Sequence, residues 1–218
     1  IYHMFYGMQK SYGNLEGALA IMANGALILQ FPLAHSFLLS KRGQKILSLL
    51  GPKDLAISLS TTSFTIVASI QLFVLFMLWS PSKIVFELPF EFLIYILPIL
   101  YCLSWFLLIV ATIDAGLEVQ SGALGWISVV ARKKPKFPEL PTTGLYRVIR
   151  HPIYASFFLA VLTVPTWTAD QFVVSLILGG YCIFAPILKD RRLIDRHGKK
   201  YLSYKNTTPY MLPSKRIK

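Results

Sequence analysis

Four long apolar stretches, separated by polar segments, dominate the chain. They cover residues 15–39, 55–79, 90–113 and 153–188. A helix that crosses a bilayer needs about 20 mostly apolar residues, so each of the first three stretches predicts one membrane span. The fourth is long enough for two short helices, with a turn at residues 165–170. The pattern therefore predicts five spans.

The composition supports this interpretation. Of the 218 residues, 55% are hydrophobic and only 15% are charged, and the mean hydropathy is +0.56. Soluble domains carry about 25% charged residues. The first stretch lacks the short apolar core and the cleavage site of a removed signal peptide, so it is expected to remain as a span. We therefore predict an all-α integral membrane protein.

The formal charge of +12 is unevenly placed. Cationic residues cluster at 41–53, at 132–150 and after residue 188, whereas the segment between the second and third spans holds only Lys83. Cytoplasmic loops are enriched in such residues. The pattern predicts an inner (cytoplasmic) membrane protein with its N-terminus and the turn at Asp170 outside, and with both basic loops and the C-terminus in the cytoplasm. Membrane lipids are then the expected partners of this charge, and nucleic acid is not.

One membrane domain, 1–218, is expected. It comprises three N-terminal spans (1–113), a cytoplasmic loop (114–152), a helical hairpin (153–188) and a cytoplasmic tail (189–218). Three prolines in 133–141 exclude a helix there, so this part of the loop should form an extended strap. The tail has the pattern of a basic amphipathic helix with a break at Gly198. Cys102 and Cys182 lie inside apolar stretches, which predicts buried packing rather than a disulfide framework.

Several polar residues precede the hairpin in the sequence GLYRVIRHPIY, residues 144–154. Pro152 suits the first turn of a helix, and the unpaired amides at a helix start favour an anionic group. A carboxylate or phosphate is therefore expected beside Arg150 and His151, neither of which is expected in the apolar core. The alternative is that the arginines reach lipid phosphates while Tyr146 and Tyr154 join an interfacial aromatic belt.

A second charged cluster begins with Asp190 and Arg191, where the hairpin returns to the same membrane face. The two clusters should therefore be neighbours. Tyr201 and Tyr204, three positions apart on a helix, are expected to close an aromatic wall over a ligand. His35, near the end of the first span, is a further candidate because ionisable groups inside a membrane are often functional. A histidine bonded to a backbone carbonyl is the alternative.

Other chemistry has no support in the sequence. It contains no glycine-rich phosphate loop, no cysteine pairs with zinc spacing and no His-Glu-x-x-His motif. A metal site is therefore not predicted.

The segments GLYRVIRHPIYASFFLAVLTVPTWT and RRLIDRHGKKYLSY resemble the C-terminal signature of the membrane-embedded S-adenosylmethionine-dependent methyltransferases. This superfamily includes isoprenylcysteine carboxyl methyltransferase. The first span with its His-Ser, the Thr-Val-Pro-Thr-Trp-Thr turn and the closing Pro-Tyr-Met-Leu-Pro (209–213) are most similar to the branch of methanethiol S-methyltransferase and NnrU-like proteins. The resemblance covers essentially the whole chain, although the specific motifs lie within 141–213.

The resemblance implies five spans and a C-terminal half that folds over S-adenosylmethionine on the cytoplasmic side. The acceptor would be a small hydrophobic thiol or a lipid-like molecule that arrives from within the membrane. The residues that would bind the donor are Tyr146, Arg150, His151, Pro152, Tyr154, Asp190, Tyr201 and Tyr204. His35 and Arg191 would be catalytic, because a base or a cation near a thiol raises its thiolate fraction.

Two departures from the family pattern affect the alternatives. The family has two consecutive glutamates where this chain has Lys189 and Asp190, and a glycine where Ser156 stands. The Lys189 departure leaves open a non-catalytic membrane subunit. A methyltransferase for isoprenylcysteine or lipid is a second alternative. A NADPH-dependent membrane reductase is a third, because sterol reductases share a similar C-terminal fold, but their Arg-His-Pro-Asn-Tyr-x-Gly-Asp pattern is missing here.

Overall fold

The computed structural model describes residues 1–52 and 54–213. Lys53 of the first basic loop and the last five residues of the tail, including Lys215, lie outside this part. Within it, the secondary structure is helical, and the single β-type pairing is an isolated bridge between Val85 and Thr168. The predicted all-α class is confirmed.

Four helices are long and apolar enough to cross a membrane. They are α2 (Gly17–Leu38), α4 (Ala56–Leu78), α5 (Leu93–Asp114) and α10 (Ala169–His197). The hairpin predicted at 153–188 is present, but its first arm, α9 (Pro152–Leu162), has only 11 residues. At 1.5 Å per residue it is about 16 Å long, which is roughly half of the hydrocarbon thickness. The fifth predicted span is therefore a half-length helix.

The chain divides into two compact units. One unit contains residues 10–82 and 115–139, and the other contains 1–9, 83–114 and 140–218. We call them the α2–α4 unit and the α5–α10 unit. Their cooperation as one membrane domain stays a prediction.

In the α2–α4 unit the two long helices run antiparallel and are tied by polar side chains. Asn24 pairs with the backbone of Ser80 at 2.8 and 2.9 Å, and the Gln30 and Gln71 side chains are joined at 2.9 Å. At one end of this pair lie α3 (Lys41–Leu47), the 3-10 helix η1 (Ser48–Leu50), α6 (Leu117–Gln120) and α7 (Ala123–Val130). Amide pairs of this kind hold helices together where lipid offers no hydrogen bonds.

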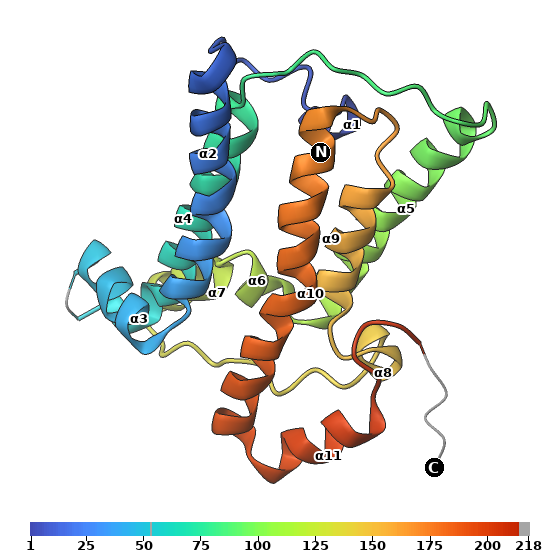
Figure 1. Cartoon of the computed structure of the whole chain (residues 1–218). Coiled ribbons are helices and arrows are strands. Elements are labelled where there is room, and N and C mark those ends of the chain that lie inside the picture. Colours follow the sequence, from blue (N-terminus) through green and yellow to red (C-terminus); the bar gives the residue numbers. More distant parts are fainter. Residues whose placement is uncertain (53, 214–218) are drawn as a thin grey trace. The chain divides into compact units, whose positions relative to one another are not determined.

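The α5–α10 unit is built around α9, which packs against both α5 and α10 (Figure 1). Because α9 is short, its last carbonyls end among apolar side chains. The Val161 carbonyl accepts hydrogen bonds from Gln171 Nε2 at 3.0 Å and from Ser175 Oγ at 2.7 Å, and both donors are buried on α10. Side chains of the neighbouring helix thus donate hydrogen bonds to a carbonyl at the end of α9. A membrane-spanning protein requires such partners because lipid offers none.

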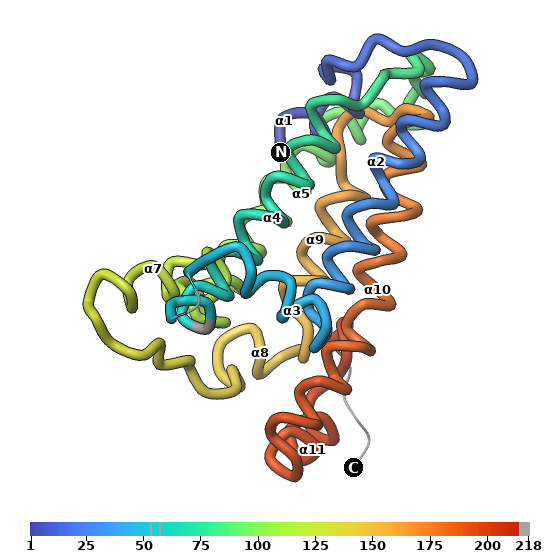
Figure 2. The backbone as a smooth tube through the Cα atoms, turned by 90° about the vertical axis from the view of Figure 1, so that its left-hand side faces the viewer, coloured from blue at the N-terminus to red at the C-terminus, as the bar shows by residue number. Residues whose placement is uncertain are grey.

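The remaining elements of this unit are α1 (Tyr2–Phe5), α8 (Leu145–Val148) and α11 (Lys199–Thr207). The predicted break at Gly198 is confirmed, since this residue has φ +52° and separates α10 from α11. The chain changes direction sharply there (Figure 2). Residues 134–142 contain no helix, as their prolines require. The burial predicted for the two cysteines is right for Cys182 and wrong for Cys102, which is exposed on α5.

Candidate functional site

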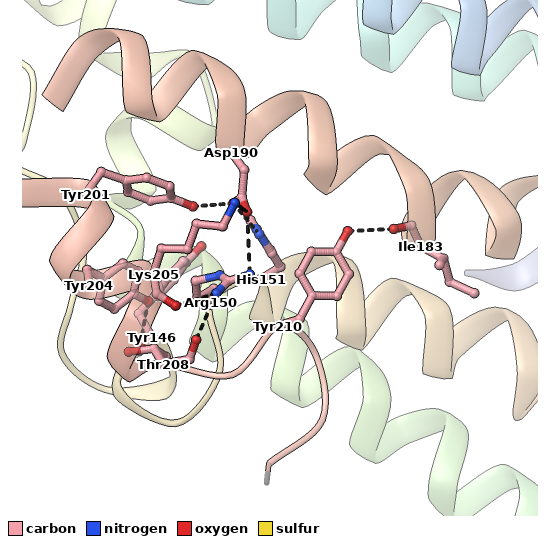
Figure 3. A network of polar contacts seen from close by, with 10 residues as sticks. All are labelled: Tyr146, Arg150, His151, Ile183, Asp190, Tyr201, Tyr204, Lys205, Thr208 and Tyr210. Atoms are coloured by element: carbon pink, nitrogen blue, oxygen red, sulfur yellow. Dashed lines mark hydrogen bonds and ion pairs between the residues drawn. The ribbon is translucent and has the colours of Figure 1, made fainter. Parts of the chain in front are cut away.

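The two clusters predicted to be neighbours meet at one end of the α5–α10 unit (Figure 3). The Asp190 carboxylate lies 2.9 Å from His151 Nε2 and 3.5 Å from the Arg150 guanidinium. It also lies 3.3 Å from Lys205 Nζ and accepts a hydrogen bond from the Tyr201 hydroxyl. One carboxylate on α10 therefore joins the start of α9 to the tail.

Arg150 holds the tail through backbone groups as well. Its Nη1 donates to the carbonyls of Lys205 at 2.7 Å and Thr208 at 3.0 Å. Its own amide donates to the Pro209 carbonyl at 2.8 Å. A planar guanidinium suits such a multiple arrangement, because its donors are fixed in a fork. Segment 205–209 is consequently bonded to Arg150, two positions before α9.

Tyr210 continues this cover beyond the carbonyls. Its ring centroid lies 5.1 Å from that of His151, and the Arg150 guanidinium carbon lies 5.6 Å from the same centroid. The Tyr210 hydroxyl donates to the carbonyl of Ile183 on α10 at 2.7 Å. The tail therefore contacts His151 and Arg150 through Tyr210 and is bonded to α10 at Ile183.

The burial of this cluster corrects one expectation. Only 6% of Arg150 and 1% of His151 is exposed, although the sequence placed both outside the core. They are buried because the tail, which is distant in sequence, covers them. Substitution of either residue will therefore affect folding.

Local backbone structure positions Tyr146 beside the cluster. The Asp114 carboxylate accepts a 2.8 Å hydrogen bond from the amide of Leu145, the first residue of α8. The preceding residue, Gly144, has φ +57°, and a Cβ there would lie 2.2 Å from the Asp114 carboxylate, so only glycine fits. The Tyr204 hydroxyl then donates to the Tyr146 carbonyl at 2.6 Å, which links α11 to α8.

Three buried polar atoms at the start of α9 have no hydrogen-bond partner in the described part of the chain. They are Tyr146 Oη, Arg150 Nε and His151 Nδ1. An unpaired buried polar atom costs about 1–3 kcal/mol, and three within six residues are unusual. This combination is typical of a site that binds a polar ligand.

The protonation states define what these atoms offer. Burial lowers the pKa of His151, and the hydrogen bond to Asp190 opposes this shift. His151 is then neutral at pH 7, and its Nε2–H faces the carboxylate, which leaves Nδ1 as an acceptor. Burial raises the pKa of Tyr146, so its hydroxyl remains a donor. The site thus provides two donors, from Tyr146 and Arg150, and one acceptor.

The other predicted site residues lie in three environments. Pro152 is the first residue of α9. Tyr154, on α9, has its ring 5.6 Å from the Lys189 ammonium and 6.1 Å from the His151 ring. Arg191 is exposed on α10, next to Asp190. His35 belongs to the α2–α4 unit, where its ring packs against Phe64 at 4.8 Å. The catalytic roles of Arg191 and His35 stay predictions.

Sequence reasoning missed two parts of the cluster, Lys205 and Tyr210. Lys205 is one of ten cations after residue 188, and nothing in the sequence distinguishes it from the others. Tyr210 belongs to the closing Pro-Tyr-Met-Leu-Pro motif, so its place in a motif was a usable signal.

Comparison with known proteins gives a consistent relationship. The methanethiol S-methyltransferase of Pseudomonas deceptionensis is 26% identical over 214 residues, which cover 96% of this chain and 80% of that protein. The corresponding protein of Crocosphaera subtropica is 25% identical over 89% of this chain and 75% of its own length. Methanethiol S-methyltransferase 1 of Bradyrhizobium diazoefficiens is 26% identical over 90% of this chain and 68% of its own length.

This chain is related to methanethiol S-methyltransferases. The relationship predicted from the hairpin and tail motifs is thereby confirmed, and it extends over nearly the whole chain. No family model and no solved structure matches the sequence.

Proposed function

We propose that this protein is an integral membrane methyltransferase that moves a methyl group from S-adenosylmethionine to a small hydrophobic thiol. The observation that carries the proposal is the set of three unpaired buried atoms, Tyr146 Oη, Arg150 Nε and His151 Nδ1. The similarity to methanethiol S-methyltransferases over nearly the whole chain supports the reaction class.

The amino-acid end of S-adenosylmethionine fits this set chemically. Its carboxylate needs donors, which Arg150 Nε and the Tyr146 hydroxyl provide. Its ammonium group needs an acceptor, which neutral His151 provides at Nδ1. Asp190 positions His151 and Arg150, and the tail residues Tyr201 and Tyr204 hold the cover in place. These residues, together with Pro152 and Tyr154, form the proposed donor site.

When bound, S-adenosylmethionine supplies a methyl group on a positively charged sulfur. The acceptor sulfur forms a bond to the methyl carbon while the bond from that carbon to the donor sulfur breaks, and its electron pair neutralises the sulfonium. The contribution of the chain is to align the reactants and to exclude water. A thiol reacts as its thiolate, so its proton must leave before or during transfer.

We assign to Lys189 the role of a cation that favours the thiolate. Its ammonium group lies over the Tyr154 ring, and no described carboxylate forms an ion pair with it. This position is next to His151 and at the end of the apolar part of α10. The residue that departs from the family pattern therefore has a function in this proposal, which is to stabilise the anionic acceptor.

Titration of the purified protein in nanodiscs tests the donor. We expect heat of binding with S-adenosylmethionine and none with NADPH. Methyl transfer is tested with methanethiol and a labelled donor, with labelled dimethyl sulfide as the expected product. Binding of NADPH without binding of S-adenosylmethionine would favour the reductase, and binding of neither would favour the non-catalytic subunit.

The acceptor class is tested with the same preparation. A farnesylated cysteine analogue and a phospholipid with a free amine replace methanethiol in parallel reactions. Label in the thioether alone supports the proposal. Label in the prenylated or lipid product alone would replace the small thiol by the corresponding membrane acceptor.

A further inference from the structure

The short helix α7 of the α2–α4 unit has two different faces. Gly125 packs so closely on α4 that a Cβ would lie 2.4 Å from the Ser58 carbonyl. Gly122 is also close to α4, since a Cβ there would lie 3.0 Å from Thr62, and Ser128 is buried. Gly125 therefore marks the face of α7 that packs on α4, and Gly122, which precedes the helix, extends this contact.

The other face of α7 is apolar and exposed. The exposed fractions are 61% for Trp126, 55% for Ile127 and 66% for Val130. Neighbouring turns of the same unit add Leu49 and Leu50, exposed by 81% and 62%. Figure 2 shows α3 and α7 near the same end of α4. Exposed apolar side chains therefore gather where this membrane helix begins.

The depth of α7 follows from its contacts with α4. The α4 residues that face Gly122 and Gly125 lie between Ser58 and Thr65, and Ser58 belongs to the first turn of α4 (Ala56–Leu78). Seven residues correspond to about 10 Å along a helix. Gly125 lies nearer than Gly122 to the first turn of α4. Helix α7 therefore starts about 10 Å along α4 and runs toward the membrane surface. Interfacial helices insert their apolar faces to about 5–10 Å.

A basic segment follows α7 directly. Residues 121–138 contain four cations, Arg132, Lys133, Lys134 and Lys136, and no acidic residue. The helix ends with a hydrogen bond from the Lys133 amide to the Ser128 carbonyl at 2.9 Å. Arg132 has φ +51°, a conformation that usually selects glycine. The cations are thus held immediately beyond the apolar face.

We propose that α7 is an interfacial helix that binds anionic phospholipids. Trp126, Ile127 and Val130 enter the acyl boundary, and the 132–136 segment binds the headgroup phosphates. Two features select lipid as the occupant. The face continues the lipid-exposed surface of α4, where Ile66 and Ile70 are also more than half exposed, and the charge is complementary to anionic headgroups. None of these residues belongs to the proposed donor site.

Quenching of tryptophan by brominated lipid tests the proposal. The full chain is placed in nanodiscs in which either phosphatidylglycerol or phosphatidylcholine carries bromine on its acyl chains, at equal mole fraction. The signal of Trp126 is the difference between the parent protein and Trp126→Phe. We expect phosphatidylglycerol to quench it about threefold more strongly than phosphatidylcholine, because the adjacent cations attract anionic headgroups and salt screens part of this attraction.

Charge substitutions separate local binding from bulk attraction. The triple change Arg132→Gln, Lys133→Gln and Lys134→Gln should abolish the preference for phosphatidylglycerol. The matched change of three exposed cations at the junction of α10 and α11 should preserve it; these are Arg196→Gln, Lys199→Gln and Lys200→Gln.

Three results would overturn the proposal. They are equal quenching by the two lipids in the parent protein, loss of preference in the control variant alone, and a Trp126 signal that neither lipid quenches. The last result would mean that a protein surface covers α7. If the first triple variant does not fold, the parent protein still provides a test, because about 1 M salt must remove the preference by screening.

Discussion

Replacing Tyr146 by phenylalanine separates ligand binding from folding at the proposed donor site. The substitution removes a hydroxyl from a side chain that is only 3% exposed, and this hydroxyl has no partner in the described part of the chain. The hydrogen bond that Tyr146 accepts from Tyr204 uses the backbone carbonyl and is retained. No intramolecular hydrogen bond is therefore lost.

The two expected effects have opposite signs. Without ligand, Tyr146→Phe should be at least as stable as the parent protein, because removing an unpaired buried group relieves up to about 1–3 kcal/mol. Binding of S-adenosylmethionine should weaken by about 10- to 150-fold, since a hydrogen bond to a charged group contributes about 1.5–3 kcal/mol.

The assay combines calorimetric titration with a thermal-unfolding midpoint in the same nanodiscs. Tyr210→Phe is the matched control, because it removes a hydroxyl that donates to the Ile183 carbonyl. It should lower stability by about 0.5–1.5 kcal/mol and leave the donor contacts in place. A lower midpoint for Tyr146→Phe together with unchanged donor affinity would refute the assignment of this hydroxyl to the ligand.

Four further predictions concern the same unit. Asp190→Asn should cost about 3–5 kcal/mol of folding stability, because it leaves the buried Arg150 guanidinium without its carboxylate. A parent-like unfolding midpoint would exclude the role of Asp190 in holding the tail. Burial lowers the pKa of His151 below its ordinary value of 6.5, so the unfolded chain binds a proton at this residue more readily than the folded chain does. The free energy of unfolding should therefore be highest above about pH 6.5 and decrease as the pH falls below that value. In pH-dependent unfolding measurements, His151→Gln should make this decrease smaller. Lys189→Glu should preserve or modestly tighten donor affinity. It should lower kcat/KM for the thiol by about tenfold or more, because an anion replaces a cation near the thiolate. Lys189→Met is the uncharged reference, and an unchanged kcat/KM for the thiol would show that Lys189 has no role in the reaction. Single cysteines at Lys83 and Lys199, in a background without the two native cysteines, should react with a membrane-impermeant maleimide from opposite sides of the membrane. The reason is that these positions lie at the two ends of α10. Labelling of both positions from the same side would contradict the hairpin topology.

The topology test uses Lys83 rather than Asp170 because of how the turn is built. Asp170 is only 5% exposed and accepts a hydrogen bond from Gln9 at 3.1 Å. The sequence identified the turn but gave no indication that residues 1–9 cover it. A cysteine at Asp170 would therefore report burial instead of membrane side.

The sequence by itself determined the features that depend on local composition. Runs of about 20 apolar residues fix where spanning helices form, because a bilayer admits only backbone that is internally hydrogen-bonded. The break at Gly198 and the extended strap followed from single residues with restricted or permissive backbones. The motifs around Arg150 and Tyr201 were enough to indicate the related proteins.

Tertiary structure decided the length of α9 and the partners of every charge in the cluster. The apolar pattern of 153–188 is equally compatible with two full spans, whereas α9 ends at Leu162. Gln171 and Ser175 on α10 bond the carbonyl of its next-to-last residue, Val161. Hydropathy records how apolar a segment is, but it does not record which distant side chain satisfies a given polar atom. For the same reason, the sequence could not show that Asp190 binds Arg150, nor that the tail buries both; such contacts depend on segments about 40 to 60 residues apart meeting in space.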